Sequence, residues 1–172
     1  LQYLLPAFKE LLHDVPDATL TVAGDGPWLN RLKKQAGNLG LTEPQVTFPG
    51  YTTGAAKQNL INSQLVYVVP SIIADDGDAE GLPVTLMEGL AAGKLCIATN
   101  ESGADNVLTD GKDGFLVPQK NSEALAAALK KALLLDNAKK EQMESNARRT
   151  AEQFSWPVIA KKHIEFLIKE VS

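Results

Sequence analysis

Short apolar runs alternate along this chain with segments in which apolar residues recur every three or four positions. Apolar runs bounded by turn residues are typical of strands, and the three-to-four spacing is typical of helices that bury one face. The predicted strands are 19–23, 46–48, 65–69, 95–99 and 114–117, and the predicted helices are 1–12, 27–39, 54–63, 83–92 and 121 to the end with a break near 154–157. Because 65–69 is continuously apolar, we expect it to be buried on both faces of a parallel sheet.

Strands that alternate with helices through short connections predict an α/β fold, a Rossmann-like open parallel sheet with flanking helices. Ligands bind such sheets at the carboxyl ends of the strands, which here are followed by loops 24–27, 49–54, 70–83 and 100–106. A length of 172 residues suits one domain, so we assign 1–172 to a single domain. Helical spacing begins at Leu1 with no capping residue and no initiating Met, which suggests a domain excised from a longer protein.

Charge and cysteine content limit the binding partners and the cellular compartment that the sequence suggests. The net charge of −4 argues against nucleic acid as the main partner. The only cysteine, Cys96, lies in an apolar run, which excludes an internal disulfide and fits a reducing, cytoplasmic compartment. Basic residues come in pairs, which we interpret as solvated helix faces, with a weak peripheral contact to a membrane surface as the alternative. These pairs are 130–131, 139–140, 148–149 and 161–162.

The richest chemical feature is the junction between a loop and a helix that runs from Glu80 to Glu88. A helix that begins near Pro83 leaves its first amides without partners inside the helix, and with the helix dipole they form a site for a phosphate. Gly81 lets backbone approach a ligand closely. The two carboxylates flank this anion site and are suited to accept hydrogen bonds from sugar hydroxyls. The alternative is that Glu80 only favours the helix start and that Glu88 is a surface residue.

The sequence EGLPVTLMEGLAAG, which follows a buried strand ending in Pro-Ser, resembles the signature of family 4 glycosyltransferases of the GT-B fold. LLPAFKELLHDVPDATLTVAGDGP upstream, DGKDGFLVP downstream and Phe154-Ser155-Trp156 before the last helix are similar to that family in the same order. The resemblance covers nearly the whole chain. It implies the C-terminal half of a GT-B fold, with the first strand of that half preceding Leu1 and therefore missing here.

The resemblance implies a role for each matching position. Glu80 would contact hydroxyls of the transferred sugar, with backbone of Gly81 and Leu82 nearby. The amides of Val84 and Thr85 would hold the diphosphate, and Glu88 would bind the ribose hydroxyls. The base would lie against Gly50 and Tyr51, and Gly24 and Gly26 would allow backbone to approach the donor.

The implied function is transfer of a hexose, with retention, from a UDP-, GDP- or ADP-sugar, in polysaccharide or glycoconjugate biosynthesis. The resemblance implies no metal and no cofactor, because the helix dipole and basic side chains offset the charge of the leaving diphosphate. It also implies an N-terminal acceptor domain, so this domain is expected to be inactive alone. Trp156 would support the last helix where it meets that domain.

Two departures from the family pattern limit these assignments. The family's phosphate-binding Arg and Lys follow the strand that would precede Leu1, so neither is in this chain. Where the family often has a glutamate, the segment 102–106 ends in Asn106, to which we assign no role.

Two other sequence motifs and two other functions are alternatives to a glycosyltransferase donor site. Gly24-Asp25-Gly26 begins like a dinucleotide fingerprint, but position 29 is Leu, where the third glycine should stand. Asp76-Gly77-Asp78, near Asp75 and Glu80, matches the metal-binding Asp-x-Asp of another glycosyltransferase fold, although a solvated acidic loop is the simpler interpretation. A GT-B-like nucleotide-sugar epimerase and a non-catalytic nucleotide-sugar-binding module remain alternative functions.

Overall fold

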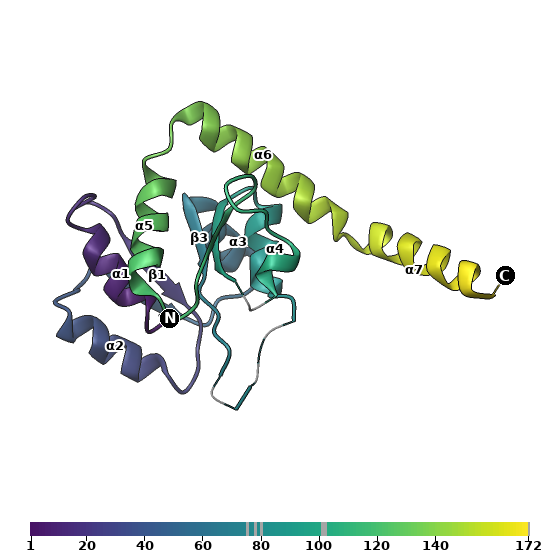
Figure 1. Ribbon diagram of the computed structural model, residues 1–172. Helices are drawn as coiled ribbons and strands as arrows, with labels where there is room; N and C mark the ends of the chain where they lie inside the picture. Colours follow the sequence, from purple (N-terminus) through teal and green to yellow (C-terminus); the bar gives the residue numbers. More distant parts are fainter. Residues whose placement is uncertain (75, 78, 80, 101–102, 172) are drawn as a thin grey trace.

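The computed structural model describes residues 1–74, 76–77, 79, 81–100 and 103–171 (Figure 1). The strands are β1 (Leu20–Ala23), β2 (Val46–Gly50), β3 (Val66–Val69), β4 (Leu95–Thr99) and β5 (Phe115–Val117). The helices are α1 (Leu4–Leu11), α2 (Leu29–Asn38), α3 (Gly54–Ser63), α4 (Val84–Ala91), α5 (Ser122–Leu133), α6 (Asn137–Gln153) and α7 (Trp156–Val171), with a 3₁₀ turn at Ala104–Asn106. Each predicted strand is therefore present, with boundaries that differ by at most two residues.

Every strand pair is parallel, which confirms the predicted α/β class. β1 pairs with β2, and β3, β4 and β5 form a second sheet in that order. The register sets Leu20 opposite Val46 and Val66 opposite Leu95. Because parallel strands carry their carboxyl ends to the same edge, the loops after them gather on one side of the molecule.

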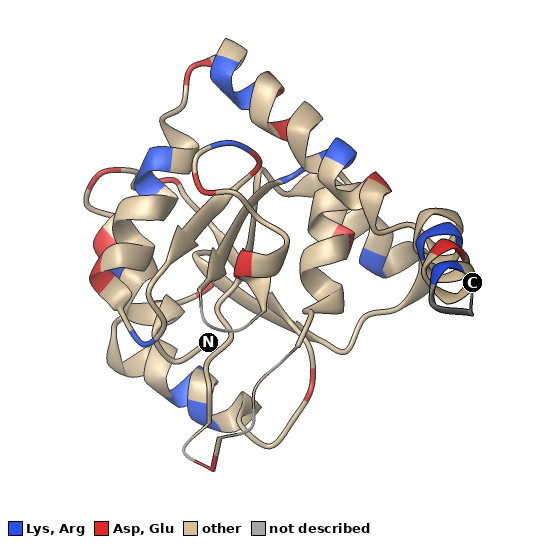
Figure 2. Cartoon of the chain, turned by 45° about the vertical axis from the view of Figure 1, so that its right-hand side comes forward, with Lys and Arg blue, Asp and Glu red and all other residues tan. Residues whose placement is uncertain are grey.

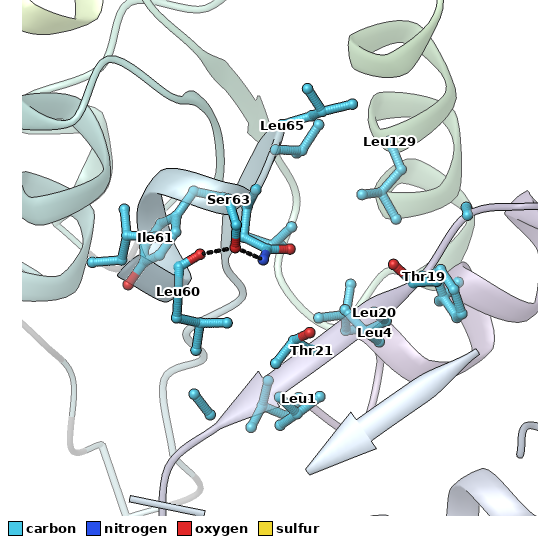
Figure 3. Close-up of a pocket in the computed structure, with 18 of the residues that line it drawn as sticks. Leu1, Leu4, Thr19, Leu20, Thr21, Leu60, Ile61, Ser63, Leu65 and Leu129 are labelled. Carbon is cyan, nitrogen blue, oxygen red and sulfur yellow. Dashed lines mark hydrogen bonds between the residues drawn. The ribbon is translucent and has the colours of Figure 1, made fainter. Parts of the chain in front are cut away.

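The two sheets flank a cavity of about 660 Å³, lined by Thr19–Ala23 of the β1 segment, by Leu65–Val68 of the β3 segment and by side chains of α1 and α5 (Figure 3). Within the described residues no strand occupies this space. Its end nearest the loops that follow the strands is where a ligand is expected to bind in such a sheet.

Strand β4 lies at the centre of the second sheet, and all five of its residues are buried. Its side chains alternate between two cores, as the two-residue period of a strand requires. Leu95 and Ile97 pack into the core shared with α1 and α5, whereas Cys96 and Ala98 pack with α4 and with Ala147 of α6. The helices therefore cover both faces, as expected for a Rossmann-like fold.

The expectation that 65–69 is buried on both faces was wrong. The side chain of Leu65 is 58% exposed, and Val66, Tyr67 and Val68 are only half-buried. The reason is that β3 pairs with β4 on one side alone, while its other edge borders the cavity. The central, fully buried position belongs to β4.

A buried carboxylate ties the turn before β5 to α6. Asp113 is almost inaccessible to solvent, and its two oxygens accept hydrogen bonds from the Thr109 amide at 2.7 Å and the Thr150 hydroxyl at 2.8 Å. Because both oxygens have partners, the charge is accommodated inside the protein. The Asp-Gly-Lys-Asp-Gly sequence is thus a structural turn that positions β5.

The helical pattern after residue 121 breaks once more than predicted, at 134–136, which separates α5 from α6. Asp136 begins α6, where its carboxylate accepts a hydrogen bond from the Lys139 amide at 2.8 Å. Helix α7 extends away from the body of the protein (Figure 1), and Trp156 at its start is 85% exposed. Within the described residues, no helix combines the length and apolarity needed to cross a bilayer.

The four basic pairs lie on three different helices, α5, α6 and α7. Lys and Arg are spread over several helices (Figure 2). Lys130 forms an ion pair with Asp14 at 2.7 Å, and the Lys131 ammonium lies 4.9 Å from the centre of the Phe115 ring. These contacts favour the interpretation of the pairs as ordinary helix surface, and the weak membrane contact stays a prediction.

Cys96 is expected to resist thiol reagents. Burial, and secondarily the charge of Asp113, raises the pKa of its thiol from an ordinary 9.0 to about 12. Only the thiolate reacts, so at pH 8 a disulfide reagent should label Cys96 after denaturation and not in the folded protein. Because the folded pKa exceeds the unfolded one, this group lowers the stability as the pH rises from about 9 towards 12. Equal labelling rates in folded and denatured protein would contradict the buried placement.

Candidate functional site

The site begins at the first turn of α4. Pro83 is buried, with φ −64° and ψ 108°, and it precedes the helix instead of forming its first residue as predicted. The amides of Leu86 and Met87 donate to the Pro83 carbonyl at 3.0 and 3.3 Å. The amides of Val84 and Thr85 have no acceptor among the described residues, and both residues are exposed. Among the described residues, two hydrogen-bond donors at the positive end of the helix dipole are therefore left without an acceptor.

Glu88 lies one turn further along α4, about 6 Å from Val84 along the helix axis. Its Oε1 atom forms an ion pair with the Lys57 ammonium at 2.7 Å. Its Oε2 atom is buried and has no partner among the described residues. The carboxylate also acts on Tyr67, whose pKa is raised by burial first, then by the charge of Glu88 and by Cys96. Glu88 is thus a half-buried carboxylate with one acceptor atom left open, and not the simple surface residue of the alternative interpretation.

The turns after β1 and β2 lie together, as the sequence predicted. The Gly24 amide donates to the Gly50 carbonyl at 2.8 Å, so the ends of the two strands are tied by the backbone itself. Gly50 has φ 79°, a conformation that glycine adopts without strain. The ring of Tyr51 is 77% exposed, and the space around Gly24 and Gly26 is open.

These elements meet around one end of the cavity between the sheets. Gly24, Tyr51 and Thr85 line this cavity together with Lys57 of α3. Lys57 also lines a second cavity of about 420 Å³, which it shares with Glu88. The Lys57 side chain therefore lies where the two cavities approach each other.

Part of the predicted site falls outside the described residues. Glu80, to which the resemblance assigns contact with the transferred sugar, is one of these, as are Asp75 and Asp78 of the acidic stretch. Gly81 and Leu82 are described and are exposed immediately before α4.

The loop after β4 contributes one further open acceptor. The Oδ1 atom of Asn100 is buried without a partner among the described residues, at the carboxyl end of the strand. Asn106, to which no role was assigned, is exposed in the 3₁₀ turn.

Lys57 was not among the residues predicted from the sequence. It follows the start of a helix with no motif around it, and it stands 31 positions from Glu88 in the chain. Only the packing of α3 beside α4 brings the two charges together, so no local spacing could have indicated the pair.

Gly89, which follows Glu88, allows α4 to pack closely on β3 and β4. A Cβ atom at this position would stand 2.6 Å from Cδ1 of Tyr67 and 3.0 Å from the sulfur of Cys96. Gly89→Ala is therefore expected to lower the free energy of unfolding by about 1–2 kcal/mol, because overpacking outweighs the gain in helix propensity.

Gly37 of α2 provides the matched control for this prediction. It is also helical, but an added Cβ would meet nothing within 4 Å. Gly37→Ala should raise the free energy of unfolding by up to about 1 kcal/mol. Urea denaturation of both variants measures the two signs, and a stabilised Gly89→Ala variant would show that α4 does not approach β3 this closely.

Comparisons with known proteins agree with this architecture. The family model described as "Glycosyl transferases group 1" matches residues 1–150. The putative colanic acid biosynthesis glycosyltransferase WcaL of Salmonella typhimurium is 33% identical over 82% of this chain and 35% of its own length. The GDP-mannose-dependent alpha-(1-6)-phosphatidylinositol monomannoside mannosyltransferase of Mycobacterium tuberculosis is 31% identical over 95% of this chain and 43% of its own. The crystal structure of Anabaena HepE in complex with UDP-glucose superposes with a TM-score of 0.80 at 25% identity, over 97% of this chain and 44% of that one.

The fold and its likeness to solved glycosyltransferases define this chain as a Rossmann-like domain of the GT-B class, of the type found as the C-terminal domain of such glycosyltransferases. It belongs to the family of group 1 glycosyl transferases. The chain spans less than half the length of the relatives it matches.

Proposed function

We propose that this chain is the donor-binding domain of a two-domain retaining glycosyltransferase that takes its sugar from a nucleoside diphosphate. The observation that carries the proposal is the geometry of α4. Two amides at its start have no acceptor within the part of the chain that the structure describes, and one turn later a glutamate has a buried oxygen that likewise has no partner there. A nucleoside diphosphate carries matching groups over a similarly short distance. Its diphosphate accepts hydrogen bonds from amides, and its ribose hydroxyls donate hydrogen bonds to a carboxylate.

The remaining residues receive the roles that the family resemblance implies. Tyr51 and Gly50 would contact the base, and Gly24 would leave room for the donor. Glu80, with backbone of Gly81 and Leu82, would contact the transferred sugar. The names of the relatives support both a uridine and a guanosine donor, since HepE was crystallised with UDP-glucose and the mycobacterial relative is GDP-mannose-dependent.

In the proposed reaction the bond between the anomeric carbon and the diphosphate oxygen breaks, and a bond from that carbon to an acceptor hydroxyl forms on the same face. The hydroxyl proton passes to the departing diphosphate. The amides of Val84 and Thr85 and the dipole of α4 stabilise the charge of the leaving group, which is the work that a metal ion performs in other transferases. We place no metal and no cofactor in this domain.

Helix α7 would contact the acceptor domain. Its exposed apolar side chains, which include Trp156 and Phe166, would pack against an acceptor domain contributed by the same polypeptide. That complete enzyme, which contains this chain and the acceptor domain, is proposed to act in assembly of a polysaccharide or glycoconjugate, as the names of relatives such as WcaL suggest.

The test is to incubate the complete enzyme with UDP-, GDP- and ADP-sugars and acceptor extract, and to follow the anomeric proton by NMR. We expect transfer from one donor class, with the anomeric configuration of the donor kept in the product. An inverted product would contradict retention. Interconversion of the donor sugar without an acceptor would indicate the epimerase, and binding without any reaction would indicate a sensor module.

A further inference from the structure

Lys57 is a charged residue of the cavity wall that the roles above leave unused. It is the fourth residue of α3, and its ammonium lies 2.7 Å from Glu88 Oε1. The two side chains are 36% and 33% exposed, so both are partly withdrawn from solvent. Lys57 also lines both cavities, and it shares the wall of the smaller one with Glu88.

The two oxygens of the Glu88 carboxylate have different surroundings. Oε1 is occupied by Lys57, whereas Oε2 is buried without a partner among the described residues. A buried acceptor left unpaired opposes folding, so its presence at a cavity points to a ligand that completes it. Without Lys57 the carboxylate would be free to rotate towards solvent, and Oε2 would lose its fixed direction.

Stability alone does not explain this contact. Ion pairs of this exposure add little to the free energy of folding, because the lost hydration and side-chain entropy offset the attraction. We therefore explain the ion pair by the orientation that it gives to the Glu88 carboxylate, and not by a contribution to the stability of the fold.

We propose that Lys57 is a positioning residue for donor binding. It fixes Oε1 of Glu88 so that Oε2 accepts hydrogen bonds from the ribose hydroxyls of the nucleotide. This inference rests on the proposed function, since it assigns the orientation of a group in the proposed donor site.

The test is a calorimetric titration of the complete enzyme with UDP and with 2′,3′-dideoxy-UDP, which lacks both ribose hydroxyls. If GDP or ADP binds more tightly than UDP, the corresponding guanosine or adenosine pair is used. Lys57→Met should weaken UDP binding about five- to twenty-fold and leave dideoxy-UDP binding within about twofold of wild type. Lys57→Arg, which keeps the charge, should recover most of the loss. In a Glu88→Ala background, Lys57→Met should cause no further loss.

A matched control is Lys94→Met, which removes the same charge from a lysine that donates to the Asn62 carbonyl at the far end of α3. It should leave both affinities unchanged, and thermal unfolding of every variant checks that the fold is intact.

The outcomes separate the two proposals. If Lys57→Met weakens UDP and dideoxy-UDP equally, or adds its full effect to that of Glu88→Ala, Lys57 does not act through Glu88 and the inference is overturned. If the wild-type enzyme does not bind UDP, GDP or ADP at all, the proposed function itself fails. If the wild type binds UDP more tightly than dideoxy-UDP and Lys57→Met keeps the same ratio of affinities, only the role of Lys57 is overturned.

Discussion

Replacement of Val84 by proline is expected to weaken nucleoside diphosphate binding to the complete enzyme by about 10- to 100-fold, the value of one charge-assisted hydrogen bond to the diphosphate. Proline removes the Val84 amide, which has no acceptor among the described residues. The helix should tolerate it, because proline is favoured at the first helical position and Pro83 already has the extended ψ of 108° that a following proline requires.

Two comparisons make this result specific. Val84→Ala keeps the amide and should bind the nucleotide as the wild type does. Binding of the nucleoside without phosphates should be the same in Val84→Pro and in the wild type. If calorimetry finds that Val84→Pro binds the diphosphate normally while circular dichroism shows an intact helix, the start of α4 is not the phosphate site.

Glu88→Ala is expected to lower the affinity for the same nucleotide by at least about tenfold, because the ribose hydroxyls lose a charged acceptor. Calorimetric titration with UDP, GDP and ADP, before and after the substitution, measures the loss. Glu10→Ala on α1 is the control, since Glu10 is an exposed glutamate that lines neither cavity. The loss should disappear when the nucleotide lacks its 2′ and 3′ hydroxyls. An equal loss for nucleotides with and without these hydroxyls would place Glu88 elsewhere in the site.

Most of the fold was predictable because it depends on local patterns. The glycine turns and the apolar runs between them mark the five parallel strands, and parallel strands bring their carboxyl ends to one edge whatever the details of packing. The hydrogen bond between Gly24 and Gly50 fits this arrangement. The amides of Val84 and Thr85, which have no acceptor among the described residues, follow instead from the helix start that Pro83 marks in the sequence.

The errors share one cause, which is that burial depends on neighbours distant in the sequence. The apolar run 65–69 has the composition of a central strand, yet only β4 pairs with it, and so it borders a cavity. The pairing of Lys57 with Glu88 likewise requires α3 and α4 to lie side by side. The break at 134–136 was missed because Leu134 and Leu135 continue the apolar pattern of α5 past its end.

The central claim is that the nucleotide binds at the start of α4 and at the turns after β1 and β2. Amide NMR spectra of the 172-residue chain, titrated with UDP, GDP or ADP, test it most directly, since they report weak binding residue by residue. Because the basic residues that the family resemblance implies lie outside this chain, we expect affinity near the millimolar range for the best nucleotide. We expect the largest shifts at Gly24, Tyr51, Val84 and Thr85. Shifts confined to residues at the far end of the cavity, such as Leu129, or no shifts with any of the three nucleotides at several millimolar, would contradict it.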